Sequence, residues 1–512
     1  MLPLASLGFA ALGAAALARA GQFADVDGAI GAVPPRSGQR VAAAATNATN
    51  ASSSANNSTS AATPGALRVT ENSGICETTE GVNQYSGYGD LSEDEHIWFW
   101  FFESRSDPEN DPLVLWFNGG PGSSSMIGLL QELGPCRINN DSADVSLNPY
   151  SWNNNANVVF IDQPVGVGFS YGKTEVGTSQ EAASDVWDFL QIWLKDDHFS
   201  HLQKNDLAIW TESYGGHYGP TFASYFLDQN DAISSGSVDG ITLNLKVLGV
   251  GDGLTDPLHQ YPGYVTYAAA NPYHQLVNDS VISSANRSLT KEGGCLDQIV
   301  VSFLTSLRIA ACYDNGSDDV CSEAQSYCNN YILSPLGGDW DVYYVLAKDP
   351  DPYPADITDY LASVADTIGA ESNWSMTNYD VYSNFAYTGD WMRNSAIDLA
   401  KVVDAGVRTL IYVGDADFIL NYPGIEAELE ALNSTLQSDF NGQDLQAWTV
   451  SGVEAGKYKQ VGDPSGGNSL GYVRIYGAGH EVPAYKWDSL EVGQAALQMF
   501  SQVMGGKGLT ST

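Results

Sequence analysis

The sequence predicts an α/β fold built on a central, mostly parallel sheet. Six short apolar runs, rich in β-branched and aromatic residues, recur at 113–117, 158–161, 207–210, 247–250, 410–413 and 472–476. Near-continuous apolar runs are typical of strands covered on both faces. A helical pattern separates the second run from the third, and this alternation of strand and helix favours parallel pairing.

The separating helix has a clear start and a clear buried face. Thr178 and Glu181 form a capping-box pattern. Apolar residues then follow helical spacing, at Val186, Phe189, Leu190, Trp193 and Leu194. Upstream, the apolar stretch 97–102 predicts an antiparallel hairpin with the segment around 85–88.

The pattern changes between residues 250 and 410, which are rich in Tyr and Asp and hold four of the six cysteines. We interpret residues 67–504 as one domain with an insertion at about 254–405. We expect the insertion to lie over the C-terminal end of the sheet, where ligand sites of α/β folds lie. The even cysteine count predicts three disulfides in an oxidising compartment. The cysteines are Cys76, Cys136, Cys295, Cys312, Cys321 and Cys328.

The N-terminus indicates a secreted chain. Residues 1–20 read as a signal peptide, with an apolar stretch and the cleavage-like triplet Ala18-Arg19-Ala20. Residues 21–66 read as a pro-segment or as a disordered linker rich in Ser, Thr and Asn. We expect an extracellular protein without a membrane anchor; a vacuolar or lysosome-like compartment is the alternative.

Glycosylation sequons and the charge agree with this compartment. The sequon asparagines are Asn47, Asn50, Asn56, Asn57, Asn140, Asn278, Asn286, Asn315, Asn373 and Asn433. With 22 basic and 61 acidic residues the net charge is −39. Such a chain repels nucleic acid and anionic membranes, so no nucleic-acid partner is expected. We also expect it to tolerate acid pH.

The segment Thr211-Glu212-Ser213-Tyr214-Gly215 follows the third apolar run and precedes a helix-like stretch. This context predicts a nucleophile elbow, in which a sharp turn presents a serine hydroxyl to a base. Thr211 departs from the generic motif, which has Gly there. The alternative is an exposed serine at the end of a strand.

The remaining catalytic groups follow from their order along the chain. In α/β-hydrolases the order is Ser, Asp or Glu, then His. Only His480 follows the run at 410–413, so we predict that it is the general base. The loop after that run offers Asp415 and Asp417, of which we choose Asp417; Asp415 would cap the turn. The Gly-rich turn at 118–122 is suited to supply an oxyanion N–H.

Taken together, these motifs resemble those of the serine carboxypeptidase family, which has the α/β-hydrolase fold. The resemblance extends from about residue 85 to 485, in the family's order, and rests on the segments 116–125, 132–135, 162–171, 212–218, 414–417 and 479–483. It implies a serine exopeptidase that removes C-terminal residues from peptides and needs no cofactor.

The resemblance also implies individual roles. Ser213 would be the nucleophile, His480 the base and Asp417 its partner, with the N–H groups of Gly120 and Tyr214 as the oxyanion hole. The substrate's terminal carboxylate would be bound by a set comprising Asn118, Glu132 and Glu212, with Trp116 nearby. Cys76–Cys136 would be paired, and the other four cysteines would pair among themselves. Ser123 and Leu420 replace cysteines found in some members.

Two glutamates facing an anion require at least one proton between them, because close carboxylates raise each other's apparent pKa. We therefore expect activity to be favoured at acid pH. Alternatives are an esterase or acyltransferase of the same fold, or a secreted glycoprotein without activity. His198 and His201 have helical spacing, but no third ligand is evident, so we expect no metal site.

Overall fold

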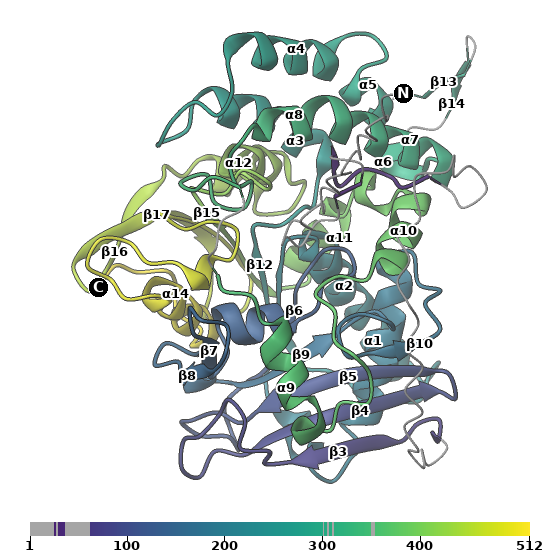
Figure 1. Cartoon of the computed structure of the whole chain (residues 1–512), viewed down its shortest axis with the longest axis vertical. Helices are drawn as coiled ribbons and strands as arrows, with labels where there is room; N and C mark the ends of the chain where they lie inside the picture. Colours follow the sequence, from purple (N-terminus) through teal and green to yellow (C-terminus); the bar gives the residue numbers. More distant parts are fainter. Residues whose placement is uncertain are drawn as a thin grey trace, which may run out of the picture.

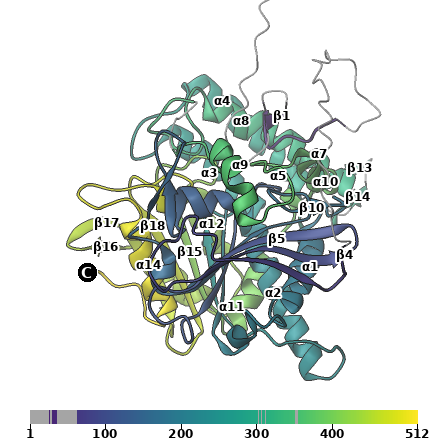
Figure 2. The same ribbon diagram turned by 60° about the horizontal axis from the view of Figure 1, so that its bottom comes forward.

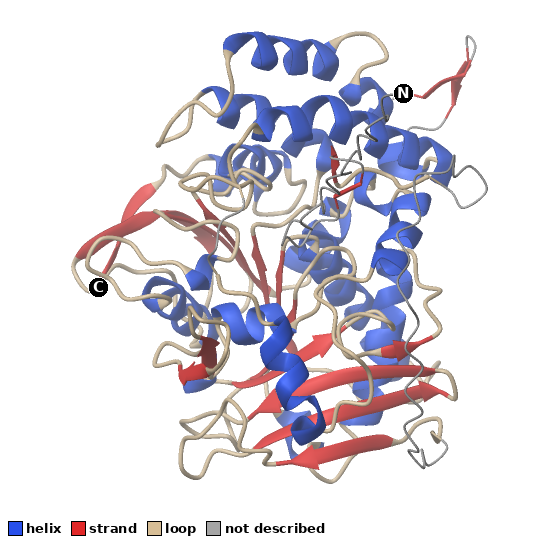
Figure 3. Cartoon of the chain, in the orientation of Figure 1, coloured by secondary structure: helices blue, strands red, loops and turns tan. Residues whose placement is uncertain are grey.

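The computed structural model describes residues 25–26, 29–35, 62–300, 302–304, 307–309, 312–349 and 354–512. The predicted signal peptide and the sequons at Asn47, Asn50, Asn56 and Asn57 lie outside these residues. Within them, a 12-stranded sheet forms the centre of the molecule (Figures 1 and 3).

Six neighbouring strands of this sheet are parallel and correspond to the six predicted apolar runs. They are, in spatial order, β18 (Ser469–Ile475), β15 (Arg408–Gly414), β12 (Leu245–Gly251), β11 (Leu207–Glu212), β6 (Leu113–Phe117) and β9 (Asn157–Asp162). Their residues are buried almost throughout, which explains why both alternating sets of positions are apolar. The α/β fold is thus confirmed.

The two ends of the sheet are antiparallel, so the sheet as a whole is mixed. β17 (Val453–Gly462) and β16 (Gln446–Val450) extend it beyond β18. On the other side, β5 (Glu95–Phe102) pairs with β9, with β4 (Gln84–Ser92) and with the short β10 (Tyr171–Gly172). The edge strand β3 (Leu67–Glu71) then pairs with β4. The predicted hairpin is confirmed, with Tyr85 opposite Phe101.

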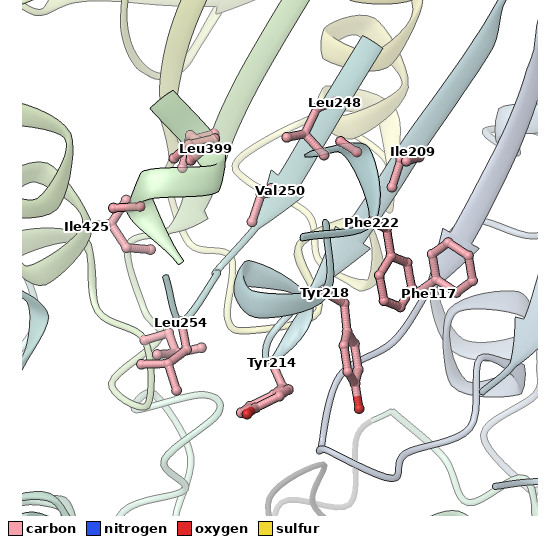
Figure 4. Close-up of a cluster of buried hydrophobic side chains, with 14 of the residues drawn as sticks. Phe117, Ile209, Tyr214, Tyr218, Phe222, Leu248, Val250, Leu254, Leu399 and Ile425 are labelled. Atoms are coloured by element: carbon pink, nitrogen blue, oxygen red, sulfur yellow. The ribbon is translucent and has the colours of Figure 1, made fainter. Parts of the chain in front are cut away.

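Helices cover both faces of the sheet. In Figure 2, α1 (Ser179–Trp193), α2 (Gly215–Ser234) and α11 (Ala396–Asp404) lie together on one side. Their apolar side chains join one face of the strands in a core that includes Phe117, Ile209 and Phe222 (Figure 4). α14 (Gln494–Met504) packs on the opposite face, where Phe500 stacks on Trp152.

The start of α1 matches the prediction from the sequence. Thr178 is its N-cap, and the Thr178 Oγ1 accepts a hydrogen bond from the Glu181 N–H at 3.2 Å. The Glu181 carboxylate in turn accepts the Gly177 N–H at 2.9 Å. The first bond satisfies an orphan N–H of the helix start, and the return bond reaches Gly177, one residue before the N-cap that the standard capping box uses.

The segment between β12 and β15, where we expect an insertion, consists mainly of helices. It comprises α3 (Pro257–Ala269), α4 (Asp279–Thr290), α5 (Cys295–Val300), α6 (Cys312–Asn315), α7 (Asp318–Cys328), α8 (Ser334–Gly337), α9 (Thr358–Ile368), α10 (Tyr379–Thr388) and α11. Helices α3 to α8 pack together away from the β3–β5 end of the sheet (Figure 1). Beyond β15, α12 (Tyr422–Ala431) packs on α3, and α13 (Gln437–Asn441) follows.

The remaining described elements are short. The hairpins are β1 (Asp25–Val26) with β2 (Ala29–Ile30), β7 (Cys136–Ile138) with β8 (Val145–Leu147), and β13 (Ser302–Leu304) with β14 (Leu307–Ile309). The single helical turns are η1 (Gly128–Glu132), η2 (Trp152–Asn154), η3 (Ser200–Lys204), η4 (Asn329–Leu333), η5 (Asp390–Met392) and η6 (Val482–Ala484). None of the helices in the described ranges is both long and apolar enough to cross a bilayer.

Residues 29–35 contact the insertion although they belong to the predicted pro-segment or linker. Ile30 is buried, and its N–H donates to the Ser334 hydroxyl at 2.9 Å. The Gly31 carbonyl accepts hydrogen bonds from the Gln325 and Asn329 side chains. For these seven residues the structure favours a docked segment over a disordered linker.

All six cysteines lie in the described part of the chain, and they form three disulfides. Cys76 bonds to Cys136, the pair that the family resemblance implied. The other four pair among themselves within the insertion, as Cys295–Cys328 and Cys312–Cys321.

Candidate active site

The predicted catalytic residues meet along one edge of the sheet. Parallel strands all end at the same edge, so the residues that follow them lie side by side. His480 follows β18, Asp417 follows β15, Ser213 follows β11 and Asn118 follows β6. The strand order therefore brings together residues from distant parts of the chain. All four are buried, with at most 1% of their surface exposed.

Ser213 lies on a strained turn between β11 and α2. Its φ angle is +68°, in the left-handed region that non-glycine residues rarely adopt. The turn is held by a hydrogen bond from the Ser213 N–H to the Gly251 carbonyl and one from the Leu254 N–H to the Ser213 carbonyl. The Ser213 hydroxyl is buried and has no hydrogen-bond partner among the described residues. This is the geometry of the predicted nucleophile elbow.

Thr211 has a place in this turn even though the generic motif has Gly. Its hydroxyl donates to the Gly215 carbonyl at 2.8 Å and so ties the strand end to the first turn of α2. A Cβ at Gly215 would lie 2.5 Å from the Thr211 Cβ, closer than atoms pack. The small residue is therefore needed at 215, where the backbone passes closest to Thr211.

His480 and Asp417 are paired. The His480 Nδ1 lies 3.0 Å from the Asp417 Oδ2. The Asp417 carboxylate also accepts the N–H groups of Ile419 at 2.9 Å and Leu420 at 3.2 Å, so three donors fix its orientation. Asp415 is turned elsewhere and accepts the Gly477 N–H at 2.8 Å. Between the two candidates, Asp417 is the carboxylate that faces the histidine.

His217 follows Ser213 closely in sequence but has a different environment. Its Nδ1 contacts the Leu254 carbonyl, and its ring stacks on Tyr214 with centroids 4.7 Å apart. Burial lowers the pKa of His217 below its usual value, which keeps the imidazole neutral.

The Gly-rich turn after β6 packs directly on the elbow. A Cβ at Gly119 would lie 2.3 Å from the Tyr214 nitrogen and 2.8 Å from the Ser213 Cβ. Gly120 has φ +109°, which glycine adopts without strain. The turns that carry Gly120 and Tyr214 therefore pack against each other at Ser213.

Asn118 holds two buried glutamates together. Its Nδ2 donates to the Glu132 Oε1 at 3.3 Å and to the Glu212 Oε1 at 3.2 Å. Its Oδ1 accepts the Trp116 Nε1–H at 2.7 Å and the Gly128 N–H at 2.9 Å, which fixes the amide orientation. Both carboxyls are fully buried.

The Glu212 carboxylate also affects the ionisation of Glu132. Burial and the neighbouring Glu212 carboxylate raise the pKa of Glu132 well above its ordinary value. A proton held on this pair converts one carboxyl into a hydrogen-bond donor, which an incoming carboxylate can accept.

Residues of the insertion also contact the site, and one of them contacts Ser123. The Tyr343 carbonyl accepts the His480 N–H at 2.8 Å. Trp391, buried, packs near Tyr214 with ring centroids 5.9 Å apart. At Ser123, where some family members have Cys, the hydroxyl instead lies 3.2 Å from the Thr377 hydroxyl of the insertion.

Sequence reasoning missed three residues that the structure places at the site: Asp252, Arg137 and Tyr343. Asp252 follows β12 directly, which is the same signal that identified Asp417. Arg137 donates to the carbonyls of Glu132 and Pro483 and so connects the glutamate turn to the His480 loop. No local signal in the sequence indicates the roles of Arg137 or Tyr343.

Other predicted site residues lie at the surface. The sequon asparagines Asn140, Asn278, Asn286, Asn373 and Asn433 are exposed, as glycosylation requires. Asn315 is in α6. His198 faces two carboxylates, with Nδ1 2.6 Å from Asp196 and Nε2 3.3 Å from Glu71.

A strained serine, a buried histidine–aspartate pair and an α/β sheet of this order define a serine hydrolase of the α/β-hydrolase class. Residues 74–506 match the family model described as serine carboxypeptidase. Carboxypeptidase S1 of Penicillium janthinellum is 42% identical over 447 residues, which cover 86% of this chain and all of that protein. Carboxypeptidase Y of Komagataella phaffii is 36% identical, over 81% of this chain and 76% of that protein.

A solved structure agrees in fold. The prohormone-processing carboxypeptidase KEX1(delta)p of Saccharomyces cerevisiae superposes with a TM-score of 0.63 at 22% identity, covering 84% of this chain and 94% of that chain. The chain therefore belongs to the serine carboxypeptidase family, and it is a serine-type carboxypeptidase.

Proposed function

We propose that this carboxypeptidase removes C-terminal residues from peptides and proteins through an acyl-enzyme, most efficiently at acid pH. The observation that carries the proposal is the Asn118–Glu132–Glu212 cluster beside Ser213. Glu212 immediately precedes the serine, so a group bound there is held within one residue of the nucleophile. A terminal carboxylate at the cluster would position the last peptide bond at the Ser213 hydroxyl.

The first half of the reaction forms the acyl-enzyme. The Ser213 Oγ attacks the carbonyl carbon of the last peptide bond, and its proton passes to the His480 Nε2. The N–H groups of Gly120 and Tyr214 stabilise the oxyanion. When the C–N bond breaks, the leaving amine takes the proton from His480, and Asp417 stabilises the imidazolium in between.

The second half repeats this chemistry with water. Water gives its proton to His480 and attacks the acyl carbon, and the Ser213 Oγ leaves with that proton. Net, one water is consumed and one peptide bond is broken. Substrate capture depends on pH because ionisation of the second carboxyl of the glutamate pair replaces a hydrogen-bond donor with a repelling charge.

We further propose that the chain is secreted and glycosylated, with residues 1–20 removed as a signal peptide and 21–66 acting as a pro-segment. The N-terminal composition and the exposed sequon asparagines support this. We also propose the domain limits given above, 67–504 with an insertion at about 254–405; the family match covers residues 74–506.

A pair of substrates tests the main proposal. A blocked dipeptide with a free C-terminus and its C-terminal amide are compared from about pH 4 to about pH 8, across the range where buried carboxyl pairs titrate. We expect the free acid to be strongly preferred at the acid end, with KM rising toward neutrality. A fluorophosphonate should label the wild type but not Ser213→Ala. Equal rates on acid and amide would show that the enzyme does not recognise the free carboxylate, and would contradict the proposal.

A further inference from the structure

Asp252 is a buried carboxyl that the reaction described above does not use. It follows β12, the strand that lies between the one ending at Asp417 and the one ending at Ser213. Asp252 is fully buried. Carboxylate oxygens of Asp252 and Asp417 and a ring nitrogen of His480 all lie within 4.8 Å of one another. It therefore occupies the middle of the catalytic edge.

The backbone holds Asp252 firmly in this place. Its φ angle is +41°, a left-handed conformation that Asp tolerates better than most residues. Its N–H donates to the Tyr412 carbonyl at 2.8 Å, and its Oδ1 accepts the Gly414 N–H at 3.0 Å. Both contacts are to β15, the strand that leads into the Asp417 loop, so the side chain is fixed relative to Asp417.

The donors around the two carboxyls are unequal. Asp417 accepts two main-chain N–H groups and faces the His480 ring, whereas Asp252 accepts one N–H through Oδ1. The buried Asp252 Oδ2 has no hydrogen-bond donor in the described part of the chain. Two adjacent buried carboxyls cannot both ionise at moderate cost. Asp417 is the carboxyl with more hydrogen-bond donors, so a proton held by this pair is better placed on Asp252.

We propose that Asp252 is a positioning residue, protonated in the active enzyme, whose Oδ2–H donates to the Asp417 carboxylate and holds it against His480. This inference rests on the proposed catalytic role of Asp417. The proton stays on Asp252 during the reaction, so no bond to it forms or breaks. A neutral donor at 252 stabilises the Asp417 charge without competing with His480 for it.

The other groups that face Asp252 act in the same direction. They are Glu212 from the end of β11, Tyr412 from β15, and the Asp417–His480 pair. Burial and then the Asp417 charge raise the pKa of Asp252 well above its ordinary value, and Glu212 adds to this. Ionisation at high pH would place two negative charges side by side and push Asp417 away from the histidine.

Two substitutions test whether Asp252 acts as a neutral hydrogen-bond donor, as a charged group or not at all. Asp252→Asn retains a donor of nearly the same shape that cannot ionise, and Asp252→Ala removes the donor. We expect the Asn variant to keep kcat within about threefold of wild type at acid pH. We expect the Ala variant to lose about tenfold to a hundredfold, the cost of a misplaced catalytic group.

The pH profile of kcat at saturating substrate is the decisive readout. Wild-type kcat should fall on the alkaline side as Asp252 ionises, and this fall should be absent in Asp252→Asn. The glutamate pair governs KM, so kcat isolates the effect of Asp252. Asp415→Asn, a buried carboxyl of the same loops that contacts Gly477, is the matched control and should keep the wild-type profile.

Three results would overturn the inference: superimposable kcat profiles of wild type and Asp252→Asn, an Asn variant as impaired as Ala at acid pH, or an active Ala variant. If Asp252→Ala does not fold, as its melting curve would show, the Asn profile alone decides. Failure of the proposed function would look different, because Ser213→Ala would then retain activity whatever residue stands at 252.

Discussion

The glutamate pair predicts how substrate affinity responds to pH, and Glu132→Gln tests it. The Glu132 carboxyl is fully buried, shares the Asn118 amide with Glu212, and has its pKa raised by burial and by Glu212. A glutamine has nearly the same shape and keeps an N–H donor at every pH. It therefore imitates the protonated glutamate permanently.

The magnitude follows from the coupling between protonation and binding. Each pH unit above the apparent pKa of the pair reduces the competent fraction about tenfold, or about 1.4 kcal/mol of binding free energy. Over two units, wild-type KM should rise about a hundredfold. Exchanging an O–H donor for an N–H donor costs only about 1 kcal/mol, so the variant should lie within several-fold of wild type at acid pH.

The assay is KM for a blocked dipeptide with a free C-terminus, measured from acid to neutral pH. We expect the KM curve of Glu132→Gln to be distinctly shallower than that of wild type. Glu428→Gln is the matched control, because Glu428 is also a fully buried glutamate with a raised pKa but lies on α12 near Thr255 and Asp256. Parallel KM curves for wild type and Glu132→Gln would refute the reasoning.

Three further predictions concern the scaffold. Gly119→Ala should abolish activity and lower the free energy of unfolding by about 1–3 kcal/mol, because its Cβ would lie 2.3 Å from the Tyr214 nitrogen. Gly442→Ala, whose Cβ would lie 3.4 Å from its nearest neighbour, is the control for kinetics and melting. Burial raises the pKa of Asp415 to about 6, so its contribution to stability, up to about 3 kcal/mol, is present below about pH 4 and lost as pH rises through 6. Melting temperatures should therefore be higher at about pH 5 than above pH 7, and the reverse order would count against this. Replacing both members of Cys76–Cys136, which are 60 residues apart, by serine should cost about 4 kcal/mol in denaturant unfolding, and an unchanged midpoint would contradict that estimate.

The sheet could be predicted because its centre has a simple physical signature. Strands buried on both faces must be apolar at every position, and the runs at 113–117 and 207–210 satisfy this. The antiparallel strands at the two ends of the sheet were harder to predict, since most positions of β17 are partly or fully exposed, and only the hairpin of β4 and β5 was recognised. The central strands and this hairpin could be predicted because their patterns are visible in the local sequence.

The parts of the site that escaped prediction depend on contacts between distant segments. The sequence Gly251-Asp252-Gly253 reads as an ordinary turn until β12 is known to lie beside β15. Residues 29–35 have a weak apolar pattern, and their burial depends on side chains such as Asn329 and Gln325 in the insertion. Thr211 looked like a departure from the motif because its bond to the Gly215 carbonyl exists only in the folded turn.

The two proposals about buried carboxyl pairs have the same physical basis. Glu212, Asp252 and Asp417 come from the ends of the neighbouring strands β11, β12 and β15 or from the loops that follow them, and Glu132 comes from η1. Under the two proposals each pair retains a proton, which places one charge instead of two in a buried region. Arg137, which reaches this region, donates to the main-chain carbonyls of Glu132, Pro483 and Val492. Under the two proposals, a retained proton neutralises part of each pair, so both substrate capture and the positioning of Asp417 should depend on pH. The two dependences are separable, because the first should appear in KM and the second in kcat.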